Sequence, residues 1–301
     1  MAPKTKKPST RNESAMEMAV PPNARTAPPG SRRRSERAEG VRRAIGERDV
    51  SGHGIHALGY RAPMQTVTLA LPSGSRRAYV AEATAPTGRA VVVLHELLGL
   101  NDDMARICDR FAEAGYLAVA PDLFEGLGMA PFCVARAMRA LADGGGPVLA
   151  IVQEIADVLG EREDVDRQAI GVAGFCMGGG FAVLAAGSGA FTVAAPFYGD
   201  VPRDPAKVPA LCPTVASFGG KDLVFRGGAD RLREHLERAE VPHDVKLYPE
   251  AGHSFMSIHR PALRPLGYLP PMFARHHPEA AADAWERVLT FFDRHLSHAP
   301  V

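Results

Sequence analysis

The sequence predicts a doubly wound α/β fold with a mostly parallel sheet and helices on both faces, and two observations support this. Six short, nearly continuous apolar runs lie between residues 90 and 248, a pattern typical of strands buried on both faces of a parallel sheet. Helix-like stretches separate these runs. Strand-helix alternation of this length implies right-handed crossovers and a sheet covered on both sides.

The expected elements follow in order along the chain. Residues 65–71 and 77–84 alternate moderately around the turn Pro-Ser-Gly-Ser and predict a hairpin. The apolar runs predict strands at residues 90–94, 117–120, 169–173, 193–197, 214–218 and 245–248. Helices are expected at residues 102–114, 133–141, 148–159, 179–186, 228–240 and 281–296. The acidic pair at the start of the first helix and Gly115 after it are suitable helix boundaries.

The first fifty residues differ in composition from the rest. Residues 1–48 contain twelve Lys and Arg against five Glu, with many Pro and Ser and little apolar periodicity. Such a segment buries too little surface to offset its ordering entropy. We therefore expect a disordered basic tail over residues 1–60 and one folded catalytic domain over residues 61–301. The tail could instead bind an acidic partner, or the true start could be Met16, Met18 or Met64.

The bulk composition excludes several classes of protein. The chain has 301 residues, with 35 Lys and Arg against 34 Asp and Glu, which argues against a dedicated nucleic-acid binder. No apolar run approaches the roughly 18 residues of a membrane span, and the basic start lacks the apolar segment of a signal peptide. The four cysteines are scattered and suggest neither a zinc site nor a disulfide framework. We expect a cytoplasmic protein without metal.

The most informative segment runs from residue 169 to residue 181. A predicted strand enters Gly-Phe-Cys-Met-Gly at residues 174–178, and a predicted helix follows at once. This is the nucleophile-elbow pattern of α/β-hydrolases, with Cys176 in the place of the usual serine. The N–H groups at a helix start favour a thiolate, and that of Met177 can point at a developing oxyanion. Cys108, Cys133 and Cys212 lack this context and are expected to be packing residues, as free cysteines usually are.

Candidates for the acid and the base follow later strands. Asp222 lies in the loop after residues 214–218, and His253 lies in the loop after residues 245–248. The nucleophile, acid and base of α/β-hydrolases follow in this order, so we predict a Cys176-His253-Asp222 triad. The alternative carboxylates are Asp200, which is the main competitor, Asp230 and Glu250; the alternative imidazoles are His243, His259, His276 and His277.

The loop after the first buried strand carries His-Glu-Leu-Leu-Gly-Leu at residues 95–100. In this position a loop normally supplies the second oxyanion donor, here predicted to be the amide of Leu97. Glu96 lies near the nucleophile but cannot donate a hydrogen bond when ionised. Taken alone, it could be a solvated loop charge.

With these motifs in order, residues 64–298 resemble the dienelactone hydrolase family. The matching stretches are residues 91–101, 115–123, 174–179, 195–199, 219–222 and 252–255, with an insertion-like stretch at residues 259–277. The resemblance implies the triad given above. It also implies that Glu96 contacts the thiol in the resting enzyme and holds or accepts its proton until substrate binds.

The departures from the family concern the substrate. Family members that open dienelactone hold its carboxylate with arginines, one of them a few residues after the catalytic His. Here the four residues after His253 contain no Arg. Arg136 and Arg139 lie in the region of the other family arginine without a clear alignment. An anionic dienelactone is therefore not favoured, and Met129, Phe132, Phe255 and Met256 suggest an apolar pocket unless they pack in the core.

The sequence thus predicts an α/β-hydrolase that cleaves a small-molecule ester or lactone through an acyl-enzyme. No cofactor, nucleic acid or membrane partner is expected, and the protein should be a monomer or small homo-oligomer. One alternative is a thioesterase or a broad carboxylesterase acting on uncharged esters. From a different class, Cys176 could serve a redox-sensing or binding module by forming a sulfenic acid.

Overall fold

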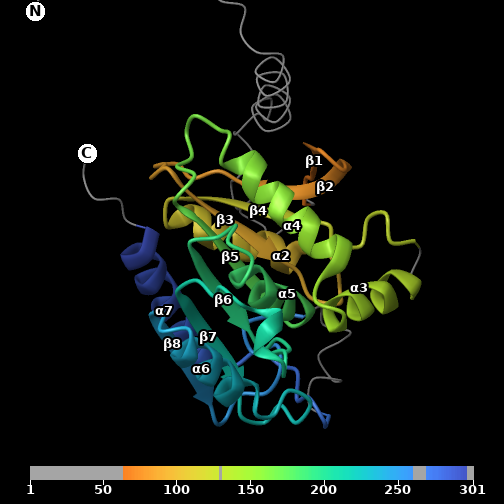
Figure 1. The fold of residues 1–301 in the computed structure, drawn as a ribbon, viewed down its shortest axis with the longest axis vertical. Helices are drawn as coiled ribbons and strands as arrows, with labels where there is room; N and C mark the ends of the chain where they lie inside the picture. The colour runs from red at the N-terminus through yellow and green to blue at the C-terminus, as the bar shows by residue number, and fades with distance from the viewer. Residues whose placement is uncertain (1–63, 129–130, 260–268, 297–301) are drawn as a thin grey trace, which may run out of the picture.

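The structure, a computed structural model, describes residues 64–128, 131–259 and 269–296. An eight-stranded sheet forms its centre, in the order β1-β2-β4-β3-β5-β6-β7-β8 (Figure 1). The strands are β1 (Val67–Leu71), β2 (Gly74–Ala81), β3 (Arg89–Leu94), β4 (Tyr116–Pro121), β5 (Ile170–Phe175), β6 (Val193–Phe197), β7 (Thr214–Gly219) and β8 (His243–Tyr248). The expected tail over residues 1–60 lies outside the described residues.

The sheet is mostly parallel, as the sequence predicts. Strands β3 to β8 run parallel to one another, whereas β1 and β2 form an antiparallel hairpin that pairs with β4. In the hairpin Leu71 pairs with Gly74, so its turn holds two residues and β2 begins three residues earlier than expected. Gly74 has a φ of 129°, a value that residues other than glycine rarely adopt.

The helices are α2 (Asp102–Glu113), α3 (Phe132–Ala142), α4 (Gly146–Leu159), α5 (Met177–Ala186), α6 (Gly228–Arg238) and α7 (Pro278–Leu296), with a short 3₁₀ turn, η2 (Pro205–Lys207). The Asn101 side chain caps α2 by accepting from the N–H groups of Asp103 and Met104. The expected helices are all present. The largest shift at a start is in α7, which begins three residues early, at Pro278; α5 begins two residues early, because no loop separates it from β5.

Two apolar cores lie on opposite faces of the sheet. On one face, α4, α5 and α6 pack on side chains such as Val92 and Val172. On the other, α2 and α7 pack on side chains such as Val91 and Val93, and Trp285 of α7 is buried in this cluster. The strands are therefore buried on both faces, which explains their continuous apolar runs. None of the described helices is long and apolar enough to span a membrane.

Candidate active site

Four loops at one edge of the sheet carry the candidate site residues. Glu96 follows β3, Cys176 follows β5, Asp222 follows β7, and His253 lies beyond β8. These strands are parallel, so their carboxyl ends meet at the same edge. All four side chains are buried, at 5, 6, 3 and 1% exposure. The fold thus brings together residues that are up to 157 positions apart, from 96 to 253.

Cys176 occupies a strained turn between β5 and α5. Its φ of 54° and ψ of −116° lie outside the regions that side-chain-bearing residues prefer. Glycines on both sides make the turn possible: a Cβ on Gly174 would lie 2.0 Å from the carbonyl oxygen of Gly178, and one on Gly178 would lie 2.2 Å from that of Leu94. The turn presents the thiol at the start of α5, as in a nucleophile elbow.

The two predicted oxyanion donors lie on neighbouring segments. Met177 is the first residue of α5, where a backbone N–H has no partner within the helix. Leu97 lies in the loop after β3. That loop packs against the elbow, because the Gly178 backbone abuts the carbonyls of Leu94 and His95.

His253 and Asp222 form a buried pair. Nδ1 of His253 lies 2.6 Å from Oδ2 of Asp222, and Oδ1 of Asp222 accepts from the N–H groups of Val224 and Phe225. Burial alone would lower the pKa of His253, but hydrogen bonding to Asp222 and the interaction with Cys176 outweigh it and raise that pKa to about 10. Within the described residues Nε2 of His253 makes no hydrogen bond of normal geometry, although Cys176 lies near enough to raise the pKa of His253.

The alternative acids have other surroundings. Asp200 is exposed in the loop after β6, Asp230 pairs with Arg233, and Glu250 pairs with Lys221 at the surface. Among the alternative imidazoles, His243 Nδ1 lies against the carbonyl of Val241 and His277 pairs with Glu279. Burial lowers the pKa of His276, and the His259 imidazole lies near enough to lower the pKa of Glu96 by electrostatic interaction.

Glu96 belongs to a buried cluster of hydroxyl groups. The Ser257 hydroxyl donates to Oε1 of Glu96, the Tyr198 hydroxyl donates to the same oxygen at 3.3 Å, and the two hydroxyls are 3.2 Å apart. Burial raises the pKa of Glu96 against the opposing hydrogen bond from Ser257. The resemblance predicts a contact between Glu96 and the thiol; the hydrogen bonds described here run to the two hydroxyls, and the contact with the thiol stays a prediction.

A buried histidine fixes the loop that carries Glu96 and Leu97. Nδ1 of His95 lies 2.7 Å from the carbonyl oxygen of Glu96, and the N–H of Leu123 donates to Nε2 at 2.9 Å. The proton therefore sits on Nδ1, which donates to the carbonyl. Burial lowers the pKa of His95, so the ring stays neutral. His95 thus joins the loop after β3 to the loop after β4.

Aromatic rings hold the imidazole of His253 in place. Phe225 stacks on it with ring centroids 5.2 Å apart, and Tyr198 meets it edge-on at 4.9 Å. Phe255 and Met256 are fully buried in the core on the α2 and α7 face, so they do not line a pocket. Phe132 is exposed at the start of α3, and Met129 lies outside the described residues.

The two arginines singled out by the sequence analysis point elsewhere. Arg136 donates to the carbonyl of Leu127, and Arg139 pairs with Asp143 at the surface of α3. Exposed apolar side chains occur in the loops beyond β3, β7 and β8, which carry the candidate site residues: Leu97, Leu98, Leu223, Val224, Ile258 and Leu269.

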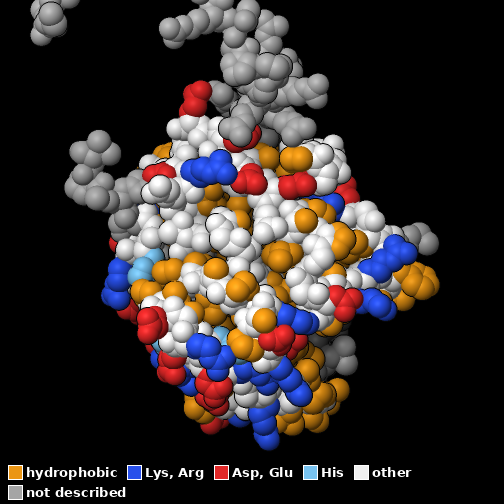
Figure 2. Space-filling model, viewed as in Figure 1, with side chains coloured by type: hydrophobic (Ala, Val, Ile, Leu, Met, Phe, Trp, Pro, Cys, Tyr) orange, Lys and Arg blue, Asp and Glu red, His pale blue; other side chains and the backbone are white. Residues whose placement is uncertain are grey.

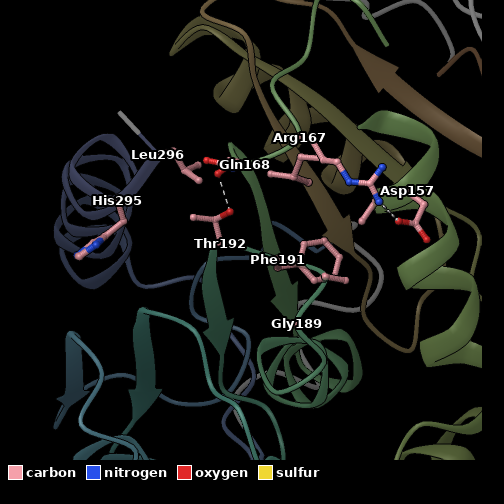
Figure 3. Close-up of a pocket in the computed structure, with 11 residues that line it drawn as sticks. Asp157, Arg167, Gln168, Gly189, Phe191, Thr192, His295 and Leu296 are labelled. Atoms are coloured by element: carbon pink, nitrogen blue, oxygen red, sulfur yellow. Dashed lines mark hydrogen bonds and ion pairs between the residues drawn. The ribbon is translucent and has the colours of Figure 1, made fainter. Parts of the chain in front are cut away.

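Two cavities lie near the ends of the strands. One, of about 690 Å³, opens at the amino ends of β5 and β6, between Arg167, Thr192 and His295 (Figure 3). It is at the edge of the sheet opposite Cys176. The other, of about 530 Å³, lies beyond the carboxyl ends of β6 and β7, on the side of the candidate site. No group of three or more His, Cys, Asp or Glu that could hold a metal occurs in the described parts of the chain.

Sequence reasoning missed Tyr198, Ser257, His95 and Phe225. Tyr198 has a φ of 40° directly after β6, and its place after an apolar run was the available signal. Ser257 lies four residues after His253, in the stretch where the family resemblance leads us to expect an arginine that this sequence lacks. The roles of His95 and Phe225 depend on contacts across the fold, to Leu123 and His253, which no local pattern carries.

A sheet of this topology, with an elbow at β5 and an acid and a base in later loops, defines the α/β-hydrolase fold. Residues 76–296 match the model of the dienelactone hydrolase family. The chain belongs to the dienelactone hydrolase family, and it is a hydrolase.

Individual proteins agree with this assignment. A carboxymethylenebutenolidase from Rhodococcus opacus is 31% identical over 224 residues, which cover 70% of this chain and 83% of that protein. A dienelactone hydrolase from Anabaena variabilis matches with a TM-score of 0.58 and 18% identity, over 77% of this chain and 98% of that one. A dienelactone hydrolase-like promiscuous phosphotriesterase from metagenomic libraries matches with a TM-score of 0.63 and 20% identity, over 78% and 99%. These two structures show the fold alone.

Proposed function

We propose that this protein hydrolyses an ester or lactone of a small molecule through a Cys176-His253-Asp222 triad and an acyl-enzyme, without a cofactor. The observation that carries the proposal is the buried pair of His253 and Asp222, 2.6 Å apart, at the same sheet edge as Cys176. A cytoplasmic location is part of this proposal and is supported by the scattered cysteines, which suggest no disulfide framework.

In the proposed reaction His253 takes the proton of the Cys176 thiol, and Asp222 holds the imidazole in the required tautomer and supports its positive charge. The thiolate attacks the carbonyl carbon, and the N–H groups of Leu97 and Met177 donate to the resulting oxyanion. When the intermediate collapses, the C–O bond to the leaving alkoxide breaks and His253 returns the proton to it. Water, deprotonated by His253, then cleaves the thioester and frees the acid.

Glu96 is proposed to control when the Cys176 thiol loses its proton. Its raised pKa favours a neutral carboxyl group, which can exchange a proton with a neighbouring thiol. The hydroxyls of Tyr198 and Ser257 fix its orientation. In this proposal substrate binding changes the surroundings of Glu96, and the thiol proton then passes to His253, which leaves a thiolate for attack.

The exposed apolar side chains in the loops beyond β3, β7 and β8 favour a substrate with apolar groups next to its reacting carbonyl. Leu97, Leu223, Val224 and Ile258 are exposed at between 39 and 52% and lie in the loops that carry, or directly follow, the candidate site residues. An uncharged ester or lactone group suits these surroundings.

The proposal is tested by the hydrolysis of 4-nitrophenyl butyrate by the wild type and by Cys176→Ala. The variant is expected to lose at least about a thousandfold in kcat/KM. Cys212→Ala is a matched control, because burial raises the pKa of Cys212 to about 12 and keeps it a thiol. Equal activity in Cys176→Ala and in the control would refute Cys176 as nucleophile.

Mass spectrometry of the quenched wild-type reaction separates the mechanism from simple loss of activity. An acyl group on Cys176, absent from the variant, is expected within the first turnover. Wild-type turnover without any acylated protein would contradict the acyl-enzyme route.

A further inference from the structure

The cavity of about 530 Å³ lies beside the candidate site, and one residue, Phe225, contacts both. The loop after β6, the loop after β7 and the start of α6 line this cavity, and Phe225 is one of its lining residues. The ring of Phe225 also stacks on His253 at 5.2 Å. The cavity therefore begins one aromatic ring away from the imidazole. Its volume lies within the range typical of small-molecule sites.

The cavity is basic. Its lining includes four cationic side chains, those of Arg203, Lys207, Arg226 and Arg231, against the two carboxylates of Asp200 and Asp204. Asp204 is occupied in capping η2, where it accepts from the N–H of Ala206 at 2.9 Å. Figure 2 shows Lys and Arg side chains gathered at the lower end of the molecule, around α6.

The positive charges lack negative partners. Within residues 64–128, 131–259 and 269–296 none of the four cations forms an ion pair. Lys207 and Arg231 donate to the neutral carbonyls of Ala142 and Val201, at 2.6 and 3.0 Å, which holds their side chains without cancelling their charge. Arg203 and Arg226 are exposed and can turn to a ligand.

The start of α6 adds to this positive field. Gly228, the first residue of the helix, lines the cavity. The preceding residue, Gly227, has no side chain with which to cap the helix. The N–H of Gly228 donates to the carbonyl of Phe225 at 3.0 Å, so what this end of α6 adds on the cavity side is the positive end of the helix dipole.

We propose that this basic cavity binds an oxyanion group, a phosphate or a carboxylate, either as a free ion or on the part of the substrate remote from the scissile bond. Arg203 and Arg226 supply planar donors suited to two oxygens of such a group. These arginines are not at the places that the family resemblance indicates, which lie after His253 and before the elbow. The substrate-borne form rests on the proposed function; binding of the free ion does not.

The test compares the wild type with Arg203→Gln/Arg226→Gln and with the control Arg238→Gln, which removes an exposed arginine at the far end of α6. Inorganic phosphate is titrated by calorimetry. Two esters of similar length, 4-nitrophenyl butyrate and mono-4-nitrophenyl glutarate, provide an uncharged and an anionic substrate. Circular dichroism and Tm check that each variant is folded.

We expect the Kd for phosphate to rise at least tenfold in the double variant and to stay unchanged in the control. A tenfold fall in the ratio of anionic to uncharged kcat/KM in the double variant assigns the oxyanion to the substrate. An unchanged ratio, with phosphate binding lost, assigns a free ion. The proposal is overturned if the wild type does not bind phosphate and the double variant has the same ratio of anionic to uncharged kcat/KM as the wild type. If no protein hydrolyses the uncharged ester, the proposed function fails while the titration still tests the cavity.

Discussion

At the scale of single residues, the site contains two buried carboxyl groups in different surroundings. Asp222 accepts from two backbone N–H groups and faces an imidazole that gains positive charge. Glu96 faces two neutral hydroxyls, those of Tyr198 and Ser257. Two carboxyl groups whose surroundings differ in this way can take different roles in one site, with Asp222 supporting a charged base and Glu96 acting in its neutral form.

The raised pKa of His253 has a consequence for stability. The folded state binds the proton of this imidazole more tightly than the unfolded state does, since its pKa is raised from 6.5 to about 10. This stabilisation is complete below pH 6.5 and is lost as the pH rises to 10. We predict that Asp222→Asn, which removes the charged acceptor, makes the free energy of unfolding less dependent on pH over this range, by about 1 kcal/mol or more.

Urea unfolding at several pH values between 6 and 10 measures this dependence for both proteins. The same variant is expected to lose about a thousandfold in kcat, because the imidazole no longer has a fixed tautomer. Parallel pH curves for the wild type and Asp222→Asn would show that the pair does not control the pKa of His253.

Glu96 allows a second prediction. Glu96→Gln keeps an oxygen that accepts from Ser257 and Tyr198, whereas Glu96→Ala leaves both hydroxyls buried without this acceptor, at a cost of about 1–3 kcal/mol. The Gln variant is therefore expected to equal or exceed the wild type in stability at pH 7, where ionised Glu96 is disfavoured by burial. Thermal unfolding of the three proteins checks the order. Equal losses in both variants would argue against the hydroxyl cluster.

The residues of the proposed triad could be selected from the sequence because each follows a strand in the order typical of the fold. The partners of Glu96 were not, because Tyr198 and Ser257 lie 102 and 161 residues away in the sequence. Arg203 and Arg226 carried no signal either, since exposed arginines follow no apolar period. The placing of Phe255 and Met256 near the substrate was not supported, because a residue next to His253 can point into the core as easily as into the site.

At the scale of elements, β5 and α5 form the rigid part of the site. Glycine is needed in this turn because neighbouring backbone leaves no room for a Cβ. We therefore predict that Gly178→Ala forces the elbow away from β3. Activity is expected to fall at least a hundredfold, and stability to fall by about 3 kcal/mol. The matched control Ala186→Gly, at the other end of α5, is expected to cost only about 1 kcal/mol and to keep activity.

Measurement of kcat/KM and urea unfolding for both variants separates the two effects. A Gly178→Ala protein with wild-type activity would mean that the elbow tolerates a side chain there. The strands and helices themselves were predictable almost throughout, because buried parallel strands have continuous apolar runs. Their ends were less so: α5 starts at Met177 because the chain passes from strand to helix through a single strained residue.

At the scale of the whole molecule, the described fold begins with residue 64 and the family match begins with residue 76. We predict that a variant lacking residues 1–60 keeps the Tm within about 2 °C and kcat/KM within about twofold of the full chain, because a segment of this composition offers too little apolar surface to contribute to folding. Limited proteolysis followed by these two measurements checks the prediction. A large loss of either would show that the tail takes part in folding or in the site.

The position of the strands in the sheet has a last consequence, which concerns local opening. Strand β5 lies in the middle of the sheet, whereas β8, which leads to His253, lies at its edge and is mostly half-exposed. Edge elements with little buried surface open at lower free energy than central ones. We therefore expect that, on warming, the loop that carries His253 separates from Cys176 before the sheet melts. Amide hydrogen exchange in β8 should outpace that in β5, and catalysis should fade reversibly below the Tm.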